Sequence, residues 1–270
     1  MRVKPIYRYV LCWLLAFSVF WPFWPQSAGT AGSARTTGVA GAAGAAPSGE
    51  EIMAALDRAL NSYQGTILMD LTVIRPGGTP RTSRLRVYIS GTEKMCLRYL
   101  EPARERGQGY LRVGDEVWMY LPNAGRSLRM SGRQNLQGTD LANDDMLRLD
   151  LFRDYDPVLV GEETVEEQDC WVVELATTDP SVTYGKMIYW VRKNDSLPVK
   201  TEYYSFAGKL LKTMYYKEIQ EIGGLVRPVR MEVHSNLREG YQTILTMIEA
   251  DFARAVDDAV FTRDFLEQKY

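Results

Sequence analysis

The chain has 270 residues, of which 46% are hydrophobic and 24% charged, so it can hold one large or two modest domains with an ordinary globular core. Its formal net charge is −2, and without the three basic residues before position 35 it retains 29 basic and 34 acidic residues. A mildly acidic protein lacks the concentrated basic field that sequence-independent nucleic-acid binding needs, so we expect no nucleic-acid partner.

The N-terminal region has the layout of a secretory signal. A basic start precedes the apolar run 10–21, and a proline-interrupted segment rich in small residues follows. Twelve apolar residues are too few to span a bilayer, which needs about twenty. We therefore predict a signal peptide over residues 1–34, cleaved between positions 28 and 34, and export to the periplasm or the outer face of the cytoplasmic membrane. The alternative is an uncleaved anchor extended through Trp24, which Pro22 disfavours.

A stretch of small residues separates this signal from the part of the chain that is expected to fold. Residues 35–49 are mostly Gly, Ala, Ser and Thr and cannot bury enough surface to fold, so they are interpreted as a flexible leader. The domain is expected to span residues 50–270 and to begin with a helix. Ser48 is a suitable N-cap, apolar residues recur after it at helical spacing, and Gly65 ends the pattern.

From Thr66 onward the hydrophobic period changes to the alternation of β-strands. The runs are rich in β-branched and aromatic residues, and connectors such as "VGDE" and "PNAGR" are typical of hairpin turns. Because a parallel crossover needs a dozen or more residues, these short connectors predict sequential antiparallel pairing in one long meander. The predicted strands cover residues 66–74, 84–90, 94–100, 109–113, 116–121, 127–131, 170–176, 186–193, 198–205, 209–222, 225–235 and 241–250.

A sheet of this size does not stay flat, because strand twist makes large antiparallel sheets curl or close. Runs such as 118–121 and 186–191 are apolar on both faces, so they must be covered on both sides. The insertion 139–155 predicts a short helix over the mouth or concave face, and 257–268 predicts a second short helix at the C-terminus. The expected fold class is mainly β with short helices, a curved antiparallel sheet forming a half-open, unclosed barrel with a helical lid.

Residue types that carry catalysis or bind metals are scarce. The one histidine, His234, lies in a predicted strand among polar residues, which is typical of a solvated side chain, and there is no Gly-x-Ser-x-Gly elbow. Zinc and EF-hand spacings do not occur. Carboxylates gather between Asp140 and Asp145, and their spacing fits acids at a helix N-terminus better than a Ca²⁺ loop. We expect no catalytic residue, no metal and no cofactor, and an enzyme is not the preferred interpretation.

Two cysteines follow the predicted signal, Cys96 and Cys170, both in strand-like runs. A disulfide requires Cα atoms within about 7 Å, which the sequence does not give. One disulfide and two buried free thiols are therefore both open.

Apolar side chains exceed what a simple core of this pattern needs. Trp118 and Trp190 lie in the two-sided strands, and tyrosine pairs follow at Tyr203/Tyr204 and Tyr215/Tyr216. Barrel core and cross-strand packing explain each aromatic singly, whereas together with a curled sheet and a helical cover they suit a cavity for an apolar ligand. The residues assigned to the cavity lining are Leu85, Val87, Ile89, Trp118, Tyr120, Leu147, Leu151 and Trp190.

The segment 109–146 carries a family resemblance. Its distinctive positions are Gly114, Asp115, Trp118, Tyr120, Pro122, Arg126 and Arg129, then Gly138, Thr139, Asp140 and Leu141. This block, with the later segment 190–216, resembles the LolA-like family of outer-membrane lipoprotein-sorting proteins over residues 50–270. Thr139 and Leu141 depart mildly from the Ser and Phe usual in that family. The resemblance implies an exported half-open barrel with a helical lid and a cavity for acyl chains, and no cavity residue is transferred from it.

The function expected from these features is that of a cell-envelope carrier or binding protein for a lipophilic ligand. Its partners would be a lipid or lipidated protein, with membrane donor and acceptor proteins, and the protein is expected to be a monomer. An envelope stress sensor or protein-interaction module that uses the same sheet is the alternative.

Overall fold

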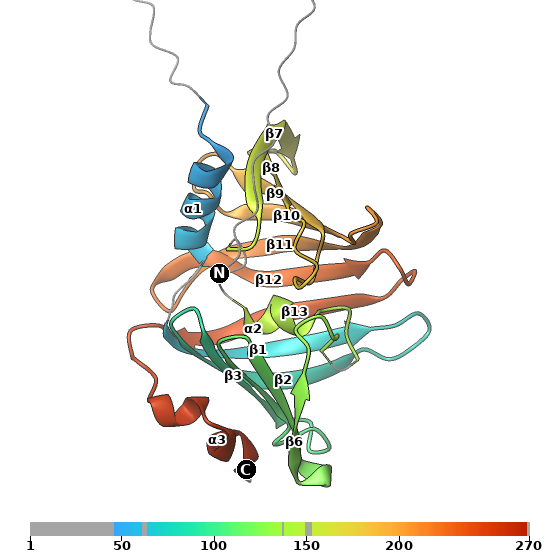
Figure 1. Cartoon of the computed structure of the whole chain (residues 1–270), viewed down its shortest axis with the longest axis vertical. Helices are drawn as coiled ribbons and strands as arrows, with labels where there is room; N and C mark the ends of the chain where they lie inside the picture. Colours follow the sequence, from blue (N-terminus) through green and yellow to red (C-terminus); the bar gives the residue numbers. More distant parts are fainter. Residues whose placement is uncertain (1–45, 61–63, 137, 149–152, 269–270) are drawn as a thin grey trace, which may run out of the picture. The chain divides into compact units, whose positions relative to one another are not determined.

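The structure is a computed structural model that describes residues 46–60, 64–136, 138–148 and 153–268. The predicted signal peptide and nearly all of the leader lie outside these residues. Residues 45–270 form one compact unit, built on a large antiparallel sheet (Figure 1). Among the described helices, none is long and apolar enough to cross a membrane.

The helical elements of the described residues are short. They are α1 (Gly49–Leu60), the 3-10 turn η1 (Pro122–Ala124), α2 (Asn143–Leu147), the 3-10 turn η2 (Asp258–Phe261) and α3 (Arg263–Glu267). The strands are β1 (Gln64–Ile74), β2 (Arg81–Ser90), β3 (Lys94–Glu101), β4 (Gly109–Val113), β5 (Glu116–Leu121), β6 (Arg126–Met130), β7 (Asp156–Val165), β8 (Gln168–Ala176), β9 (Lys186–Arg192), β10 (Pro198–Tyr204), β11 (Leu210–Ile222), β12 (Leu225–Ser235) and β13 (Gln242–Asp251). The predicted fold class is confirmed.

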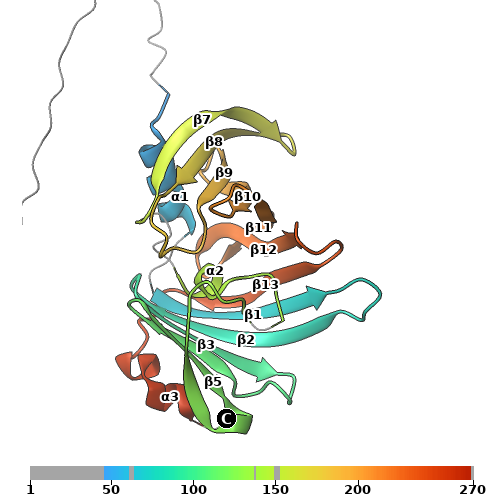
Figure 2. The same ribbon diagram turned by 45° about the vertical axis from the view of Figure 1, so that its right-hand side comes forward.

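The order of the strands is that of two meanders joined in the middle of the sheet. It runs β6-β5-β4-β3-β2-β1-β13-β12-β11-β10-β9-β8-β7, so the first strand pairs with the last, and β6 and β7 are the two edges. The expectation of a single meander is therefore wrong at one connection, that between β6 and β7. Short connectors force neighbouring strands to pair, but residues 131–155 are long enough to travel from one edge to the other. The sheet curves without closing, and α2 lies inside the curve (Figure 2).

Helix α1 forms for the reasons that the sequence suggested. The Ser48 hydroxyl accepts a hydrogen bond from the Glu51 amide (3.2 Å), and the Glu51 carboxylate accepts one from the Ser48 amide (2.8 Å), which completes a capping box. Ile52, Met53 and Leu56 are buried against the sheet, where α1 contacts β7, β8 and β12. A side chain at Gly49 would collide with the backbone of β7, so this position requires glycine. The helix therefore covers one half of the inner face.

The strands that are apolar on both sides are covered on both sides, as predicted. The inner face, defined as the face toward α1 and α2, carries the main core. The outer face carries two smaller clusters, one over β3–β5 beneath η2 and α3, and one over β8–β10. The C-terminal helix is held by Arg98 of β3, whose guanidinium donates to the carbonyls of Phe265 (2.5 Å) and Gln268 (2.6 Å).

Strand β7 is the one strand that the sequence did not predict. It is the outermost strand of its half, with alternating half-buried and exposed residues, and it contains Pro157 and Gly161. Val158 and Val160 are each 55% exposed. Both cysteines are buried free thiols, Cys96 in the cluster beneath η2 and α3 and Cys170 in the other outer cluster, so the disulfide alternative does not occur.

Candidate functional site

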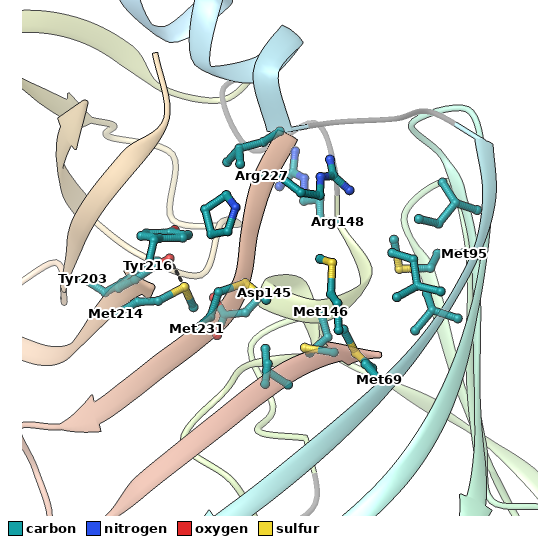
Figure 3. Close-up of a pocket in the computed structure, with 17 residues that line it drawn as sticks. Met69, Met95, Asp145, Met146, Arg148, Tyr203, Met214, Tyr216, Arg227 and Met231 are labelled. Atoms are coloured by element: carbon teal, nitrogen blue, oxygen red, sulfur yellow. Dashed lines mark hydrogen bonds between the residues drawn. The ribbon is translucent and has the colours of Figure 1, made fainter. Parts of the chain in front are cut away.

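A cavity of about 200 Å³ lies on the inner face between the two halves of the sheet. Residues of β1, β2, β3 and β10–β13 form its walls, and α2 contributes Asp145 and Met146 (Figure 3). Most of the lining is apolar, and it contains six of the eleven methionines of the chain. These methionines are Met69, Met95, Met146, Met214, Met231 and Met247.

The methionines determine what the cavity can accommodate. Sites for small organic ligands usually measure about 300–1,000 Å³, so the cavity is small for a long acyl chain in the form observed. Methionine is unbranched, with three rotatable bonds and a polarisable sulfur, and it adapts to irregular shapes at low cost. Side chains such as Met231 and Met247 are only partly buried. The lining is therefore one that can widen by rotamer changes without moving the strands.

Helix α2 is fastened over this cavity by buried charged groups. The Asp145 carboxylate forms an ion pair with Lys212 of β11, accepts a hydrogen bond from the Tyr184 hydroxyl (2.9 Å) and accepts one from the Ala142 amide (2.6 Å). The side chains of Lys212 and Asp145 are only 4% and 2% exposed. The Lys212 ammonium also lies 4.8 Å from the centre of the Tyr203 ring. This side of α2 is thus bound to the β7–β13 half of the sheet.

Two further carboxylates of the same segment make the remaining contacts. Asp144 accepts a hydrogen bond from Arg112 of β4 (3.1 Å) and another from the Thr183 hydroxyl. Asp140 forms an ion pair with Arg238. We call Asp140, Asp144, Asp145 and their partners the α2 clasp. Because Arg112 belongs to the β1–β6 half and Lys212 to the other, the clasp joins the two halves across the cavity.

The clasp sits in a low-dielectric environment. Burial lowers the pKa of Lys212 from its ordinary value, and the charge of Asp145 opposes that change. Burial raises the pKa of Tyr184 well above its ordinary value, and the neighbouring charge of Asp145 adds to the increase. Tyr189 and Tyr203 are raised in the same way, first by burial. These tyrosines therefore stay neutral hydrogen-bond donors at neutral pH.

One end of the cavity is basic. Arg148 and Arg227 both line it there, at the end away from Met69 (Figure 3). Arg148 forms an ion pair with Asp154. The Arg227 guanidinium lies 4.8 Å from the ring of Phe252. Its Nε and Nη2 atoms are buried and have no hydrogen-bond partner among the described residues.

The residues that the sequence assigned to the lining do not all lie together. Val87 and Ile89 line the cavity. Leu85 and Leu147 are buried in the core cluster of the same face without lining it. Leu151 lies outside the described residues. The alternating strand β2 was therefore a sound guide to the inner face.

The three aromatic residues of the predicted lining point to the outer face instead. Trp118 packs beneath α3, with the Arg263 guanidinium 4.5 Å from its ring centre, and Tyr120 lies in the same cluster. Trp190 donates its indole N–H to Glu163 (2.6 Å) in the other outer cluster. Their strands are apolar on both faces, so alternation alone did not determine which face the aromatics would take. The structure places none of the three in this cavity.

The lining residues that the sequence analysis missed include all six methionines and Arg227. Four of the six methionines occupy inward-facing positions of β1, β11, β12 and β13, and the alternation of those strands was the available signal, while Met95 lies on β3 and Met146 on α2. Arg227 lies near the start of β12, with apolar residues on both sides of it in the sequence. These apolar neighbours were the only sign that it is buried.

The described part of the chain contains no metal-binding arrangement. No group of three His, Cys, Asp or Glu side chains is placed to hold a metal ion there. The carboxylates between positions 140 and 145 are taken up by the clasp, which is the helix-associated role that the sequence favoured. His234 lies on β12 with its ring 5.2 Å from that of Tyr215 in an edge contact.

An open antiparallel sheet with a short helix fastened over an apolar cavity defines a β half-barrel protein with a helical lid. Solved structures of this class are similar to the described chain. A LolA superfamily protein of Nitrosomonas europaea is 31% identical, with a TM-score of 0.74, over 82% of this chain and 100% of its own. A DUF1329 family protein of Desulfovibrio piger ATCC 29098 is 25% identical, with a TM-score of 0.74, over 81% and 97%.

The family follows from these matches, and the chain belongs to the LolA superfamily. A domain of Vibrio parahaemolyticus described as an outer membrane lipoprotein-sorting protein has the same fold, with 22% identity and a TM-score of 0.71 over 82% of this chain and 98% of its own. A family model described only as uncharacterized-protein-like matches residues 91–268. The search of curated proteins gave no match. The match to the LolA superfamily protein of Nitrosomonas europaea confirms the resemblance to the LolA-like family that the sequence showed.

Proposed function

We propose that the protein is an exported, non-catalytic carrier of the cell envelope that shields the acyl chains of a lipid or lipidated protein. The observation that supports this is the methionine-rich cavity beneath α2, which the clasp fastens to both halves of the sheet. The LolA superfamily membership supports it further, since one protein of the same fold is described as a lipoprotein-sorting protein. Partner proteins that donate and accept the ligand at membranes belong to this proposal.

The affinity available from such a cavity suits carriage. Burial of one methylene group contributes about 0.8 kcal/mol, so about ten methylenes contribute about 8 kcal/mol before the costs of binding. That gross figure would correspond to a dissociation constant near the micromolar range, and the costs of binding make the net affinity weaker than this. A ligand held this moderately is handed to an acceptor without a large uphill step. Methionines such as Met231 and Met247 supply contacts that re-form around chains of different length.

Movement of α2 is the step by which the cavity would widen for a longer acyl chain. Helix α2 supplies Asp145 and Met146 to the lining, so its displacement enlarges the cavity directly. The contacts that oppose this are those of the clasp, with Arg112 on one half of the sheet and Lys212 on the other. A partner that competes for Asp144 or Asp145 would open the lid, and its departure would close it.

A second function is favoured by one observation, the uncovered edge of the sheet. Strand β7 has a free edge and exposes Val158 and Val160. Unpaired edge strands are templates for strand addition by another chain. A protein-interaction module that uses this edge would bind a partner whether or not the cavity is filled.

Uptake of a fluorescent fatty acid by delipidated protein tests the carrier directly. Met247→Phe fills the cavity from β13 and is expected to lower uptake at least tenfold, whereas Ile248→Phe on the exposed face of the same strand leaves it unchanged. Mass spectrometry of lipids that co-purify with the native protein provides the second measurement. Absence of uptake by the delipidated wild type, with no lipid co-purifying, refutes the carrier and leaves the edge-strand module.

A further inference from the structure

Arg227 differs from the other buried cations of the described chain. The cations that are buried as whole residues there are Arg98, Arg112, Lys212 and Arg227. Arg98 donates to two main-chain carbonyls, Arg112 to Asp144 and Lys212 to Asp145. Arg227 is 4% exposed and has no carboxylate or carbonyl acceptor among the described residues. It is the buried cation whose acceptor the described protein does not supply.

The position of this group is unfavourable in the absence of a ligand. A buried charge without a partner carries a large desolvation penalty, and stacking on the Phe252 ring offsets only a small part of it. Burial lowers the pKa of Arg227, yet a guanidinium whose ordinary value exceeds about 12 keeps its proton at neutral pH. Methionine or leucine at this position would fill the same space without that penalty. The stability of the fold therefore does not explain why an arginine occupies this position.

The surroundings of Arg227 show where an acceptor would sit. Its side chain lines the cavity together with Arg148, at the end away from Met69 (Figure 3). The one carboxylate in the lining, Asp145, is already paired with Lys212. Arg148 is paired with Asp154. The basic end of an apolar cavity thus retains a positive charge that the described protein does not neutralise.

We propose that Arg227, with Arg148 beside it, binds the anionic head group of an amphiphile whose apolar tail lies among the methionines. This inference rests on the proposed carrier function and narrows its ligand to molecules with a carboxylate or a phosphate at the end of an acyl chain. A guanidinium suits both groups, because its planar N–H donors match two oxygens at once. The head group supplies the acceptors that Nε and Nη2 of Arg227 lack.

The test compares amphiphiles that share a tail and differ in head group. Delipidated protein is titrated with oleate and oleoyl lysophosphatidate as the anionic probes and with oleyl alcohol as the neutral one, and with acetate and inorganic phosphate as anions without a tail. Charge-assisted hydrogen bonds are expected to make the anionic amphiphiles bind tenfold or more tightly than the alcohol. Arg227→Met should reduce both to the level of the alcohol, and Arg227→Lys should restore part of the difference. Arg230→Met serves as the control, since Arg230 pairs with Glu232 outside the cavity.

Thermal unfolding without ligand separates this role from a structural one. Removal of an uncompensated buried charge should leave Arg227→Met melting at or above the wild-type temperature, whereas loss of a structural contact would lower it. Equal binding of oleate and oleyl alcohol by the wild type overturns the head-group inference and leaves the carrier function intact. Binding of none of the three amphiphiles overturns the carrier function itself. If acetate or inorganic phosphate binds as tightly as the anionic amphiphiles, the protein has an anion site unrelated to the cavity, and the inference is also overturned.

Discussion

The ion pair between Asp145 and Lys212 gives the sharpest test of how α2 is held. Asp145→Asn removes the carboxylate charge and keeps the size of the side chain, so the Lys212 ammonium is left buried and unpaired. Breaking a buried pair from one side costs about 3–5 kcal/mol of unfolding free energy. Both side chains are almost fully buried, so the full range applies here. For a domain whose urea m-value is about 2 kcal/mol per molar, the midpoint falls by about 1.5–2.5 M.

The double mutant decides whether the pair or the individual groups matter. Lys212→Met removes the ammonium, and the combined Asp145→Asn/Lys212→Met variant leaves no buried charge at either position. We expect this variant to recover most of the stability lost in Asp145→Asn, because replacing both partners of a buried pair is often close to neutral. Tyr184 keeps an acceptor in the asparagine oxygen, which limits the remaining loss.

Urea unfolding followed by tryptophan fluorescence measures all three variants. Asp258→Asn is the control, because its ion pair with Lys94 is largely exposed and such pairs contribute little. A loss below about 1 kcal/mol for Asp145→Asn would refute the buried-pair account. A double variant no more stable than the worse of the two single variants would also refute it.

Two further outcomes follow from the clasp and from the core tyrosines. Gly132→Ala places a methyl group against the Asp144 carboxylate without changing any charge, so it should displace Asp144 from Arg112 and Thr183 and increase the rate of fatty-acid uptake. The control Gly208→Ala, in an open turn, should leave that rate unchanged. An unaltered rate in Gly132→Ala would mean that Asp144 does not hold the lid. Burial raises the pKa values of Tyr184, Tyr189 and Tyr203. The unfolded chain therefore ionises first, and the stability that these tyrosines contribute is fully present below about pH 10 and declines as the pH rises above it. Urea unfolding between about pH 9 and about pH 11, with phenolate absorbance recorded in parallel, should show this decline, and early ionisation of these tyrosines in the folded protein would contradict it.

Local signals in the sequence were sufficient for most of the secondary structure. The N-cap residue Ser48 and the change of period at Thr66 correspond to the start of α1 and the course of β1. Strand β7 was not predicted because it is an edge strand with a proline, a glycine and several acidic residues. It therefore lacks the apolar alternation that burial imposes on inner strands. The path of the connection from β6 to β7 was not predicted, because no local sequence pattern indicates which edge of the sheet a long connector reaches.

The site was predicted less completely than the sheet, for a physical reason. Alternation identifies a face only where one of the two faces is polar, which holds for β2 and made Val87 and Ile89 assignable to the cavity side. In β5 and β9 both faces are apolar, and the aromatic residues Trp118 and Trp190 lie on the outer one. Burial of Arg227 depends on strands that are far apart in the chain, so the apolar residues next to it in the sequence were only an indirect sign of it.

The topology explains why the lid lies where it does. Strands β6 and β7 are consecutive in the chain and occupy opposite edges of the sheet, so their connection has to cross one of its faces. The β3–β5 part of the outer face is covered by η2 and α3, while the inner face is open between the two meanders. Helix α2 lies on that crossing, and its acids meet Arg112 from one meander and Lys212 from the other. Because β1 and β13 pair where the two meanders meet, the clasp bridges that junction on the inner face, beside the cavity.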